Sequence, residues 1–325
     1  MKKAALKGYL FEALIKKIVS KAGFRDDFIS KQITWNRKKF HGRGAVHQID
    51  VFGEFYFSIP FIYPINILGE VKAYRSQVKL PAVRNFCGAA KDILEWYRVE
   101  TNEGGKERFS AIGEKRHTHC PAFFSLNGFS KPALEYMYAQ GIYPITYENN
   151  REIFSIYDKF DALLKQIVFK RLPKRYTIFK RFEDVLQVPS VARKRSFLKR
   201  YNELMERVSQ SNPYFGMLGG KYIVNIFFKD KRQLSGANDT QEYQIDFDGS
   251  FRIKSNGTEI AEFSFSRQFI RYYLTSKTKV NETFSYIDVF AIDENKKRAT
   301  IHRLSFDAAS KNALTNKLST EVNNA

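Results

Sequence analysis

Three side chains in the first part of the chain have the types and the spacing that a metal-dependent phosphodiesterase needs. The segment from Ile67 to Tyr74 reads I-L-G-E-V-K-A-Y. If it is a strand, Glu70 and Lys72 point to the same face, because side chains alternate along a strand. Asp50 lies twenty positions before Glu70, in H-Q-I-D-V-F-G, where it could end or bend a neighbouring strand. The two carboxylates would be oxygen ligands for Mg²⁺, and the lysine would hold or deprotonate the attacking water.

A fourth acid, Glu12, lies in a predicted helix. Apolar residues recur at helical spacing over residues 5–22, and Gly23 would end the helix. Glu12 stands next to Phe11, close to the apolar face, so it could be a solvated charge or could face a metal site. Both interpretations stay open at the level of sequence.

A glycine-rich turn precedes Asp50. Gly42 and Gly44 would let the backbone turn tightly, and Arg43 between them would suit a phosphate. His47 and Gln48 follow the turn and are candidate accessory residues. His47 would position water or contact DNA, although a lone histidine in a strand is more often a hydrogen-bonded structural residue.

The composition is strongly basic. The 325 residues include 54 Lys and Arg against 34 Asp and Glu, for a formal charge of +20. The hydrophobic content of 43% and the aromatic content of 15% are those of a packed globular protein. Such an excess of positive charge predicts attraction to a polyanion, and we expect DNA as the partner. A basic surface kept for solubility is the alternative.

Cysteine usage and hydropathy indicate a soluble cytoplasmic protein. Cys87 and Cys120 form no Cys-x-x-Cys pair, which argues against a disulfide framework or a zinc module. His117 and His119 lie beside Cys120, but this spacing matches no closed zinc site, so structural roles are expected. The basic N-terminal segment lacks the features of a signal peptide. No run approaches the roughly 20 apolar residues of a membrane span, so no membrane partner is expected.

The pattern divides the chain into three parts. Residues 1–150 alternate strands and helices and are expected to form an α/β domain around the candidate metal site. A fragment ending near Asn150 is expected to fold by itself. In this part strands are predicted over 32–40, 121–129 and 141–147, and helices over 80–99 and 130–140.

Residues 151–212 are expected to be a basic helical connector. From Lys165 to Arg200 there are twelve Lys or Arg against two acids, interleaved with aromatic residues. That pattern suits phosphate contacts, whereas the simpler alternative is a solvated helical linker. Besides Arg43, the candidate nucleic-acid-binding residues are Lys170, Arg171, Lys174, Arg175, Lys180, Arg181, Arg193, Lys194, Arg195, Lys199 and Arg200.

Residues 213–325 are expected to form a β-rich α+β domain with a recognition or regulatory role. Short alternating segments are separated by D-G-S, S-N-G-T and D-E-N-K, which is typical of hairpins. One helix is predicted over 264–276. From about Asp307 the chain lacks apolar periodicity after Leu314, so the tail is expected to fray.

Several blocks of the first part, taken in order, resemble a known nuclease family. They read G-Y-L-F-E, G-R-G-A-V-H-Q-I-D, L-G-E-V-K, V-R-N-F-C-G-A-A-K-D-I, F-F-S-L-N-G-F-S and Y-A-Q-G-I-Y. In this order they are similar to the Mrr-like branch of the PD-(D/E)xK nuclease superfamily, over about residues 5 to 148. Proteins of this branch are usually labelled restriction endonucleases. No family is recognised in the second half.

The resemblance implies a fold and a set of site residues. The fold would be a restriction-endonuclease-like mixed sheet flanked by helices. Asp50, Glu70 and Lys72 match the catalytic triad, with Asp50 and Glu70 as the metal ligands, and Glu12 matches the first-helix acid. The usual Pro-Asp dipeptide is Ile49-Asp50 here, and Glu70 stands where many Mrr proteins have Gln. The implied cofactor is Mg²⁺, for which Mn²⁺ would substitute.

The expected function is therefore an Mg²⁺-dependent endonuclease, in restriction or antiviral defence, acting as a homodimer or higher homo-oligomer. In this superfamily hydrolysis generally leaves 5′-phosphate and 3′-hydroxyl ends. A DNA repair or junction-resolving nuclease is one alternative. A nuclease effector gated by a ligand or partner through its β-rich half is another. A non-catalytic nucleic-acid-binding protein with a degenerate site is the third, although the intact acids and lysine argue against it.

Overall fold

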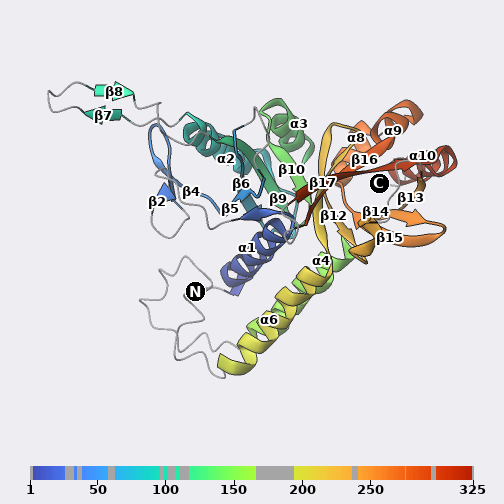
Figure 1. Ribbon diagram of the computed structural model, residues 1–325, viewed down its shortest axis with the longest axis horizontal. Coiled ribbons are helices and arrows are strands. Elements are labelled where there is room, and N and C mark those ends of the chain that lie inside the picture. Colours follow the sequence, from blue (N-terminus) through green and yellow to red (C-terminus); the bar gives the residue numbers. More distant parts are fainter. Residues whose placement is uncertain are drawn as a thin grey trace.

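The computed structural model has an α/β half and a β-barrel half that pack against each other (Figure 1). It describes residues 3–25, 33–34, 39–57, 63–95, 99–101, 107–109, 117–165, 194–235, 241–274, 276–293 and 298–323.

A five-stranded mixed sheet forms the centre of the first half, in the order β1-β5-β6-β9-β10. Strand β5 runs antiparallel to β6, whereas β6, β9 and β10 run parallel to one another. An α/β class for this half is therefore confirmed. The strands are β1 (Phe24–Arg25), β5 (Val51–Phe55), β6 (Ile65–Lys72), β9 (Thr118–Ser125) and β10 (Tyr143–Thr146).

Helices cover both faces of this sheet. Alternate residues of β6 enter different cores: Ile67 and Val71 pack with α1 (Lys3–Lys21), and Leu68 packs in the core that holds α2 and α3. The predicted helix over 80–99 is shorter than expected, because the apolar face of α2 ends at Ile93. The helices on this second face are α2 (Leu80–Leu94) and α3 (Lys131–Ala139).

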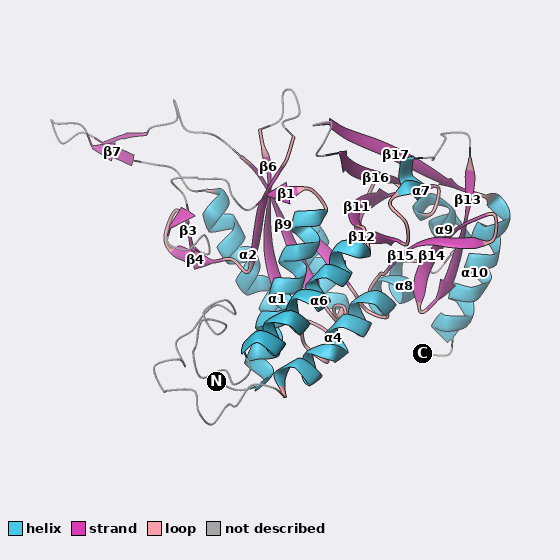
Figure 2. Cartoon of the chain, turned by 60° about the horizontal axis from the view of Figure 1, so that its bottom comes forward, coloured by secondary structure: helices cyan, strands magenta, loops and turns pink. Residues whose placement is uncertain are grey.

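Two further helices, α4 (Arg151–Leu164) and α6 (Lys194–Gln210), lie beside α1 (Figure 2). Buried apolar residues of α4 and α6, among them Phe160 and Val208, belong to the same core as α1 and the sheet. The core of the first half therefore continues past Asn150. A fragment ending there would expose the surface that α4 covers, so the expectation that it folds by itself is not supported.

Five short strands of the first half lie outside the main sheet. The single strand expected over 32–40 is two separate strands, with residues 35–38 outside the described ranges. A three-stranded sheet contains β2 (Ile33–Thr34), β3 (Lys39–His41) and β4 (Val46–Gln48), and a two-stranded sheet contains β7 (Val99–Thr101) and β8 (Glu107–Phe109).

The second half is a closed barrel in the order β11-β12-β15-β14-β13-β17-β16. The predicted hairpins at D-G-S and S-N-G-T are confirmed: Gly249, Asn256 and Gly257 have φ of 75°, 48° and 77°, as tight hairpin turns require. The strands are β11 (Pro213–Leu218), β12 (Tyr222–Phe228), β13 (Glu242–Asp248), β14 (Ser250–Ser255), β15 (Thr258–Phe263), β16 (Tyr286–Asp293) and β17 (Arg298–Phe306).

Helices accompany the barrel at three places. The helix predicted over 264–276 is confirmed as α8 (Arg267–Tyr273). A second helix that was not predicted, α9 (Lys277–Thr283), follows it, and a short helix α7 (Arg232–Ser235) follows β12. Inside the barrel, Phe251 stacks on Phe263 and Phe284, with ring centroids 5.3 and 5.0 Å apart. Such aromatic pairs add to the energy of burial.

The C-terminal tail does not fray as expected. Residues Ala308–Asn323 form helix α10, which packs on the barrel through Leu314 and Leu318, both fully buried. Asp307 Oδ1 accepts a hydrogen bond from the backbone N–H of Ser310 at 2.6 Å, which caps the first turn. Ser310 Oγ also accepts the backbone N–H of Ile245 on β13 at 3.2 Å, and Lys317 pairs with Asp246, so polar contacts add to the two leucines in attaching the helix to the barrel.

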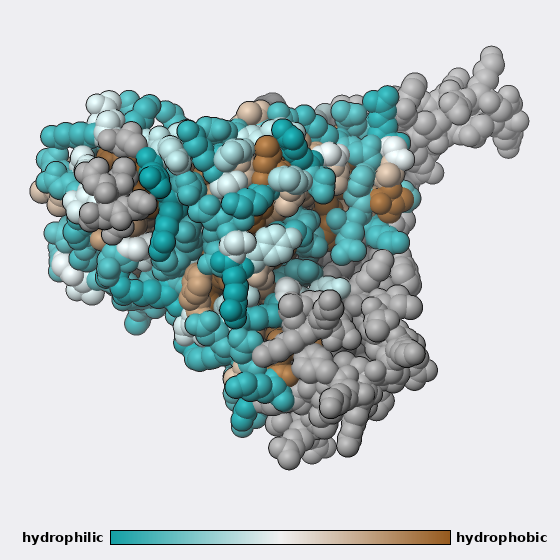
Figure 3. Space-filling model, turned by 180° about the vertical axis from the view of Figure 1, so that it is seen from behind, coloured by the Kyte–Doolittle hydropathy of each residue, from teal (hydrophilic) through white to brown (hydrophobic). Residues whose placement is uncertain are grey.

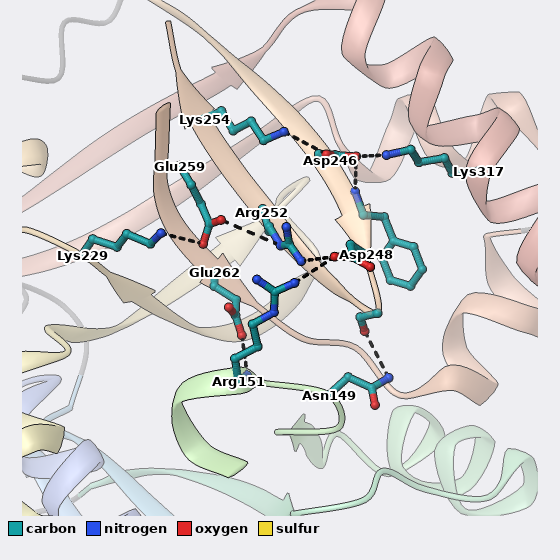
Figure 4. A network of polar contacts seen from close by, with 12 residues as sticks. Asn149, Arg151, Lys229, Asp246, Asp248, Arg252, Lys254, Glu259, Glu262 and Lys317 are labelled. Carbon is teal, nitrogen blue, oxygen red and sulfur yellow. Dashed lines mark hydrogen bonds and ion pairs between the residues drawn. The ribbon is translucent and has the colours of Figure 1, made fainter. Parts of the chain in front are cut away.

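A network of polar contacts joins the barrel to the start of α4 (Figure 4). The backbone N–H of Arg151 donates to Glu262 Oε1 at 2.8 Å, and its guanidinium lies 2.8 Å from Asp248 Oδ2. Asn149 Nδ2 donates to the carbonyl of Gly249 at 3.2 Å. The network continues along the barrel through Asp246, Arg252, Lys254, Glu259 and Lys317.

On the face shown in Figure 3, the coloured residues are mostly polar, with apolar side chains exposed in a few places. Within the described ranges, no helix has the length and apolar character that crossing a membrane would require.

The packing of α10 can be tested by truncating its buried leucines. We expect Leu314→Ala and Leu318→Ala each to lower the free energy of unfolding by about 2–5 kcal/mol, because each leaves a cavity under the helix. Asn312→Ala, at an exposed position of the same helix, is the matched control. Denaturant unfolding measures all three. Leucine variants as stable as the control would show that α10 does not contribute to the barrel core.

Candidate active site

The carboxylate of Asp50 is held against the neighbouring strand by backbone contacts. The N–H of Asp50 donates to the carbonyl of Gly69 at 3.1 Å, and Asp50 Oδ2 accepts the N–H of Val71 at 3.0 Å. Asp50 therefore lies at the start of β5, directly beside the part of β6 that carries Glu70. It is buried.

A close approach of three strands makes this arrangement possible. A Cβ added at Gly69 would lie 2.9 Å from the ring of Phe124 on β9 and 3.0 Å from Val51 on β5. A larger residue there would push β5 away from β6. The glycine just before Glu70 thus brings the two carboxylates into reach of one another.

Glu70 and Lys72 lie together on one face of β6, as the alternation predicted. Lys72 Nζ donates to Glu70 Oε1 and lies 4.0 Å from Asp50 Oδ2. The structure therefore brings Asp50, Glu70 and Lys72 into one cluster. All three side chains are largely shielded from solvent.

The electrostatics of the cluster follow from burial and from the proximity of its carboxylates. Burial raises the pKa of Glu70, the charge of Asp50 raises it further, and Lys72 offsets part of the shift. Burial alone would lower the pKa of Lys72, but Glu70 and Asp50 together raise it above its ordinary value. A lysine that holds its proton this firmly is a poor general base. Of its two expected roles, holding the water is therefore favoured.

Glu12 and a residue that sequence reasoning missed, Tyr9, face the same cluster from α1. The pKa of the Tyr9 hydroxyl is raised by burial and then by the charges of Glu12 and Asp50, which places it near both carboxylates. Glu12 Oε2 is shielded from solvent, and Glu12 acts on the same hydroxyl as Asp50, so Glu12 lies on the side of α1 nearer to the cluster. Tyr9 precedes Glu12 by three residues and therefore shares its helix face. The three-residue spacing from Glu12 is the feature of the sequence by which Tyr9 could have been found.

Asp50 and Glu70 are the candidate ligands for a divalent cation. Among the residues that the structure describes, no group of three or more His, Cys, Asp or Glu is arranged to hold a metal ion. Asp50 and Glu70 fit a different arrangement, in which two carboxylates bind Mg²⁺ and water or phosphate oxygens supply the other ligands. A bound cation would also relieve the unfavourable proximity that raises the pKa of Glu70.

The glycine-rich turn contacts α2 instead of the carboxylate cluster. Asp92 Oδ2 lies 2.5 Å from His47 Nε2, and Asp92 also accepts the N–H groups of Gly44 and Ala45. Arg43 pairs with Glu95 at 3.3 Å in an exposed position. His47 therefore anchors the turn on the helix. Gln48 ends β4 and is exposed.

The histidines near Cys120, His117 and His119, also have structural roles. His117 Nε2 lies 3.0 Å from Glu54 Oε2, and both side chains are buried. Burial, with a smaller effect of His117, lowers the pKa of His119 to about 4, so His119 is neutral at physiological pH.

Most of the predicted basic tract lies outside the residues that the structure describes. Lys199 and Arg200 are exposed on α6. Lys194 and Arg195 belong to the first turn of that helix. The remaining predicted contacts lie outside the described residues: Lys170, Arg171, Lys174, Arg175, Lys180, Arg181 and Arg193.

The fold and the cluster define an α/β domain with a buried acid–acid–lysine site, joined to a β-barrel. No family model matches the chain, and no curated protein matches it. Among solved structures, one match is the crystal structure of AF1548, a protein of unknown function. Its sequence is 14% identical to this chain. The aligned region covers 63% of this chain and 97% of AF1548, with a TM-score of 0.28. At that TM-score, the match carries no conclusion about the fold or the function of this chain.

The raised pKa of Glu70 predicts a pH dependence of stability. Because its pKa is higher in the folded state, Glu70 contributes stability below its ordinary pKa of 4.5, which is lost as pH rises through the folded value. In Glu70→Gln, the glutamine can still accept a hydrogen bond from Lys72. We expect the free energy of unfolding of this variant to fall less than that of wild type between pH 4 and neutrality. Unfolding free energies at a series of pH values measure this. Parallel curves for the two proteins would contradict it.

Proposed function

We propose that the protein is an Mg²⁺-dependent endonuclease that hydrolyses phosphodiester bonds in DNA. The observation that supports it is the convergence of Asp50, Glu70 and Lys72 at the junction of β5 and β6. An isolated Glu-x-Lys pair would carry little weight. Here the second carboxylate and the lysine meet in a shielded cluster, with Glu12 facing it from α1.

Each residue has a role in the proposed hydrolysis. Asp50 and Glu70 would hold Mg²⁺, and Mn²⁺ would substitute. When bound, the cation would polarise the scissile phosphate and lower the pKa of a coordinated water. Lys72, which stays protonated, would orient that water and offset charge in the transition state. Glu12 would complete the metal shell or hold Lys72.

Two further features support DNA as the substrate. The formal charge of +20 favours a polyanion, and the sequence blocks described above resemble Mrr-like nucleases. By that resemblance we propose a role in restriction or antiviral defence and a homodimer or higher homo-oligomer. Cleavage of a four-way junction in preference to linear duplex would instead indicate a junction-resolving enzyme.

A basic surface lies at the same end of the sheet as the cluster. The N–H of Leu126, just after β9, donates to the carbonyl of Lys72 at 3.2 Å. Three residues further on, the carbonyl of Phe129 accepts from Ser266 Oγ at 3.2 Å, which places the start of α8 there as well. We propose that phosphates beside the scissile bond contact this surface. Its exposed cations are Arg75, Lys79, Lys131, Arg267 and Arg271.

Catalysis can be separated from binding by substitution in the cluster. We expect Asp50→Asn and Lys72→Ala to reduce cleavage of plasmid DNA by about 100-fold or more. Duplex binding should change little, because it rests on dispersed phosphate contacts. Asparagine can still accept the N–H of Val71, so the fold should persist.

The exposed Glu203→Gln and Lys221→Ala are matched controls, and reactions with Mg²⁺, Mn²⁺ or a chelator test the metal requirement. Cleavage at the wild-type rate by either cluster variant would refute the site. Substrates are plasmid, methylated plasmid, single strand and four-way junction.

Two surfaces compete as the phosphate-binding region, and salt dependence distinguishes them. If Arg267 and Arg271 each contact one phosphate, replacing both with serine should flatten the slope of log K against log salt by about 1.8 on duplex DNA. The double replacement of Lys199 and Arg200 tests the predicted basic tract in the same way. A reduced slope only in the second variant would move the DNA path to α6.

A further inference from the structure

An apolar pocket lies between the sheet of the first half and the barrel. Its volume is about 250 Å³. Ile65 and Ile67 of β6 line one wall, and Met217, Ile223 and Phe290 of the barrel line the other. Both halves of the molecule therefore contribute to the site.

The turn between α1 and β1 forms one edge of this pocket. Gly23 has φ of 99°, and a Cβ there would collide with Ile292 of β16. Ala22 and Phe24, on either side of Gly23, line the pocket. The barrel thus approaches the turn as closely as a glycine permits, while the space beside it stays open.

The lining restricts the chemistry of an occupant. Among the described residues that line it, Cys120 and Tyr143 are the only ones whose side chains carry a polar group. None of these lining residues is charged, so a charged molecule would lose its hydration without gaining an ionic partner from them. The pKa of the Cys120 thiol is raised by burial, and burial followed by Cys120 raises that of Tyr143, as an apolar environment requires.

The volume indicates the size of an occupant. Apolar cavities of about 150 Å³ accept a molecule of the size of benzene. At about 250 Å³, the pocket is large enough for a compound with one or two rings.

We propose that this pocket binds a compact, uncharged, apolar small molecule, held by the sheet on one side and the barrel on the other. Such pockets at domain interfaces, with few polar groups, are typical small-molecule sites. Binding would bridge the two halves. Because Ile65 and Ile67 share strand β6 with Glu70 and Lys72, the same strand would connect the ligand to the carboxylate cluster. The proposal does not depend on nuclease activity.

The test uses 1-aminonaphthalene, an uncharged fluorescent two-ring probe, with the full-length protein. We expect saturable binding of one molecule per chain and an increase in thermal unfolding temperature with probe concentration. Ile223→Trp fills the pocket from the barrel and Ile65→Trp from the sheet. Both positions are partly exposed, so both variants should fold. Each should weaken probe binding at least tenfold.

Ile301→Trp is the control, because Ile301 is 63% exposed on β17 and does not line the pocket. A second measurement is the rate at which a maleimide modifies Cys120 in a Cys87→Ser background. Bound probe should lower this rate in proportion to the fraction of pockets that it occupies. Absence of saturable binding, or wild-type affinity in both filled variants with normal unfolding temperatures, would overturn the proposal. Cleavage assays play no part, so a failed nuclease assignment leaves this result interpretable.

Discussion

The hydrogen bond from the N–H of Val71 to the carboxylate of Asp50 is the contact on which the site depends. It holds Asp50, which comes just before β5, against the strand that carries Glu70. The two carboxylates therefore lie close together and shielded from solvent. This placement has a cost, since burial and then the charge of Asp50 raise the pKa of Glu70. Such a cost is common where a site needs concentrated negative charge.

The cluster could be predicted from sequence because it rests on local rules. Alternation along β6 places Glu70 and Lys72 on one face, and the short distance in sequence between the two strands makes their pairing easy to anticipate. Tyr9 was not predicted, since its role depends on how α1 packs on the sheet. The contact between His47 and Asp92 was also missed, because the two residues lie on separate elements and no short motif joins them.

The fold was predicted well where turn chemistry specifies it and poorly where packing does. Asn256 and Gly257 mark their hairpin by residue type alone. Closure of the barrel could not be read from the strands, because it depends on pairing between its first strand and β16, more than sixty residues later. The tail was predicted to fray because its sequence lacks apolar periodicity after Leu314. In the structure, Leu314 and Leu318 form a narrow apolar stripe. That stripe suffices only because the barrel presents a matching surface.

The order in which the barrel strands pair has a consequence during protein synthesis. Strand β11 needs β16 as its second neighbour, and β13 needs the end of β17, where Tyr243 lies opposite Phe306. These partners are translated after β11 to β15. Until then, strands β11 and β13 would lack their second neighbours. Such a nascent chain would expose unpaired strand edges and apolar side chains, which favour aggregation, so its yield in a cell would depend on how soon β16 and β17 are translated.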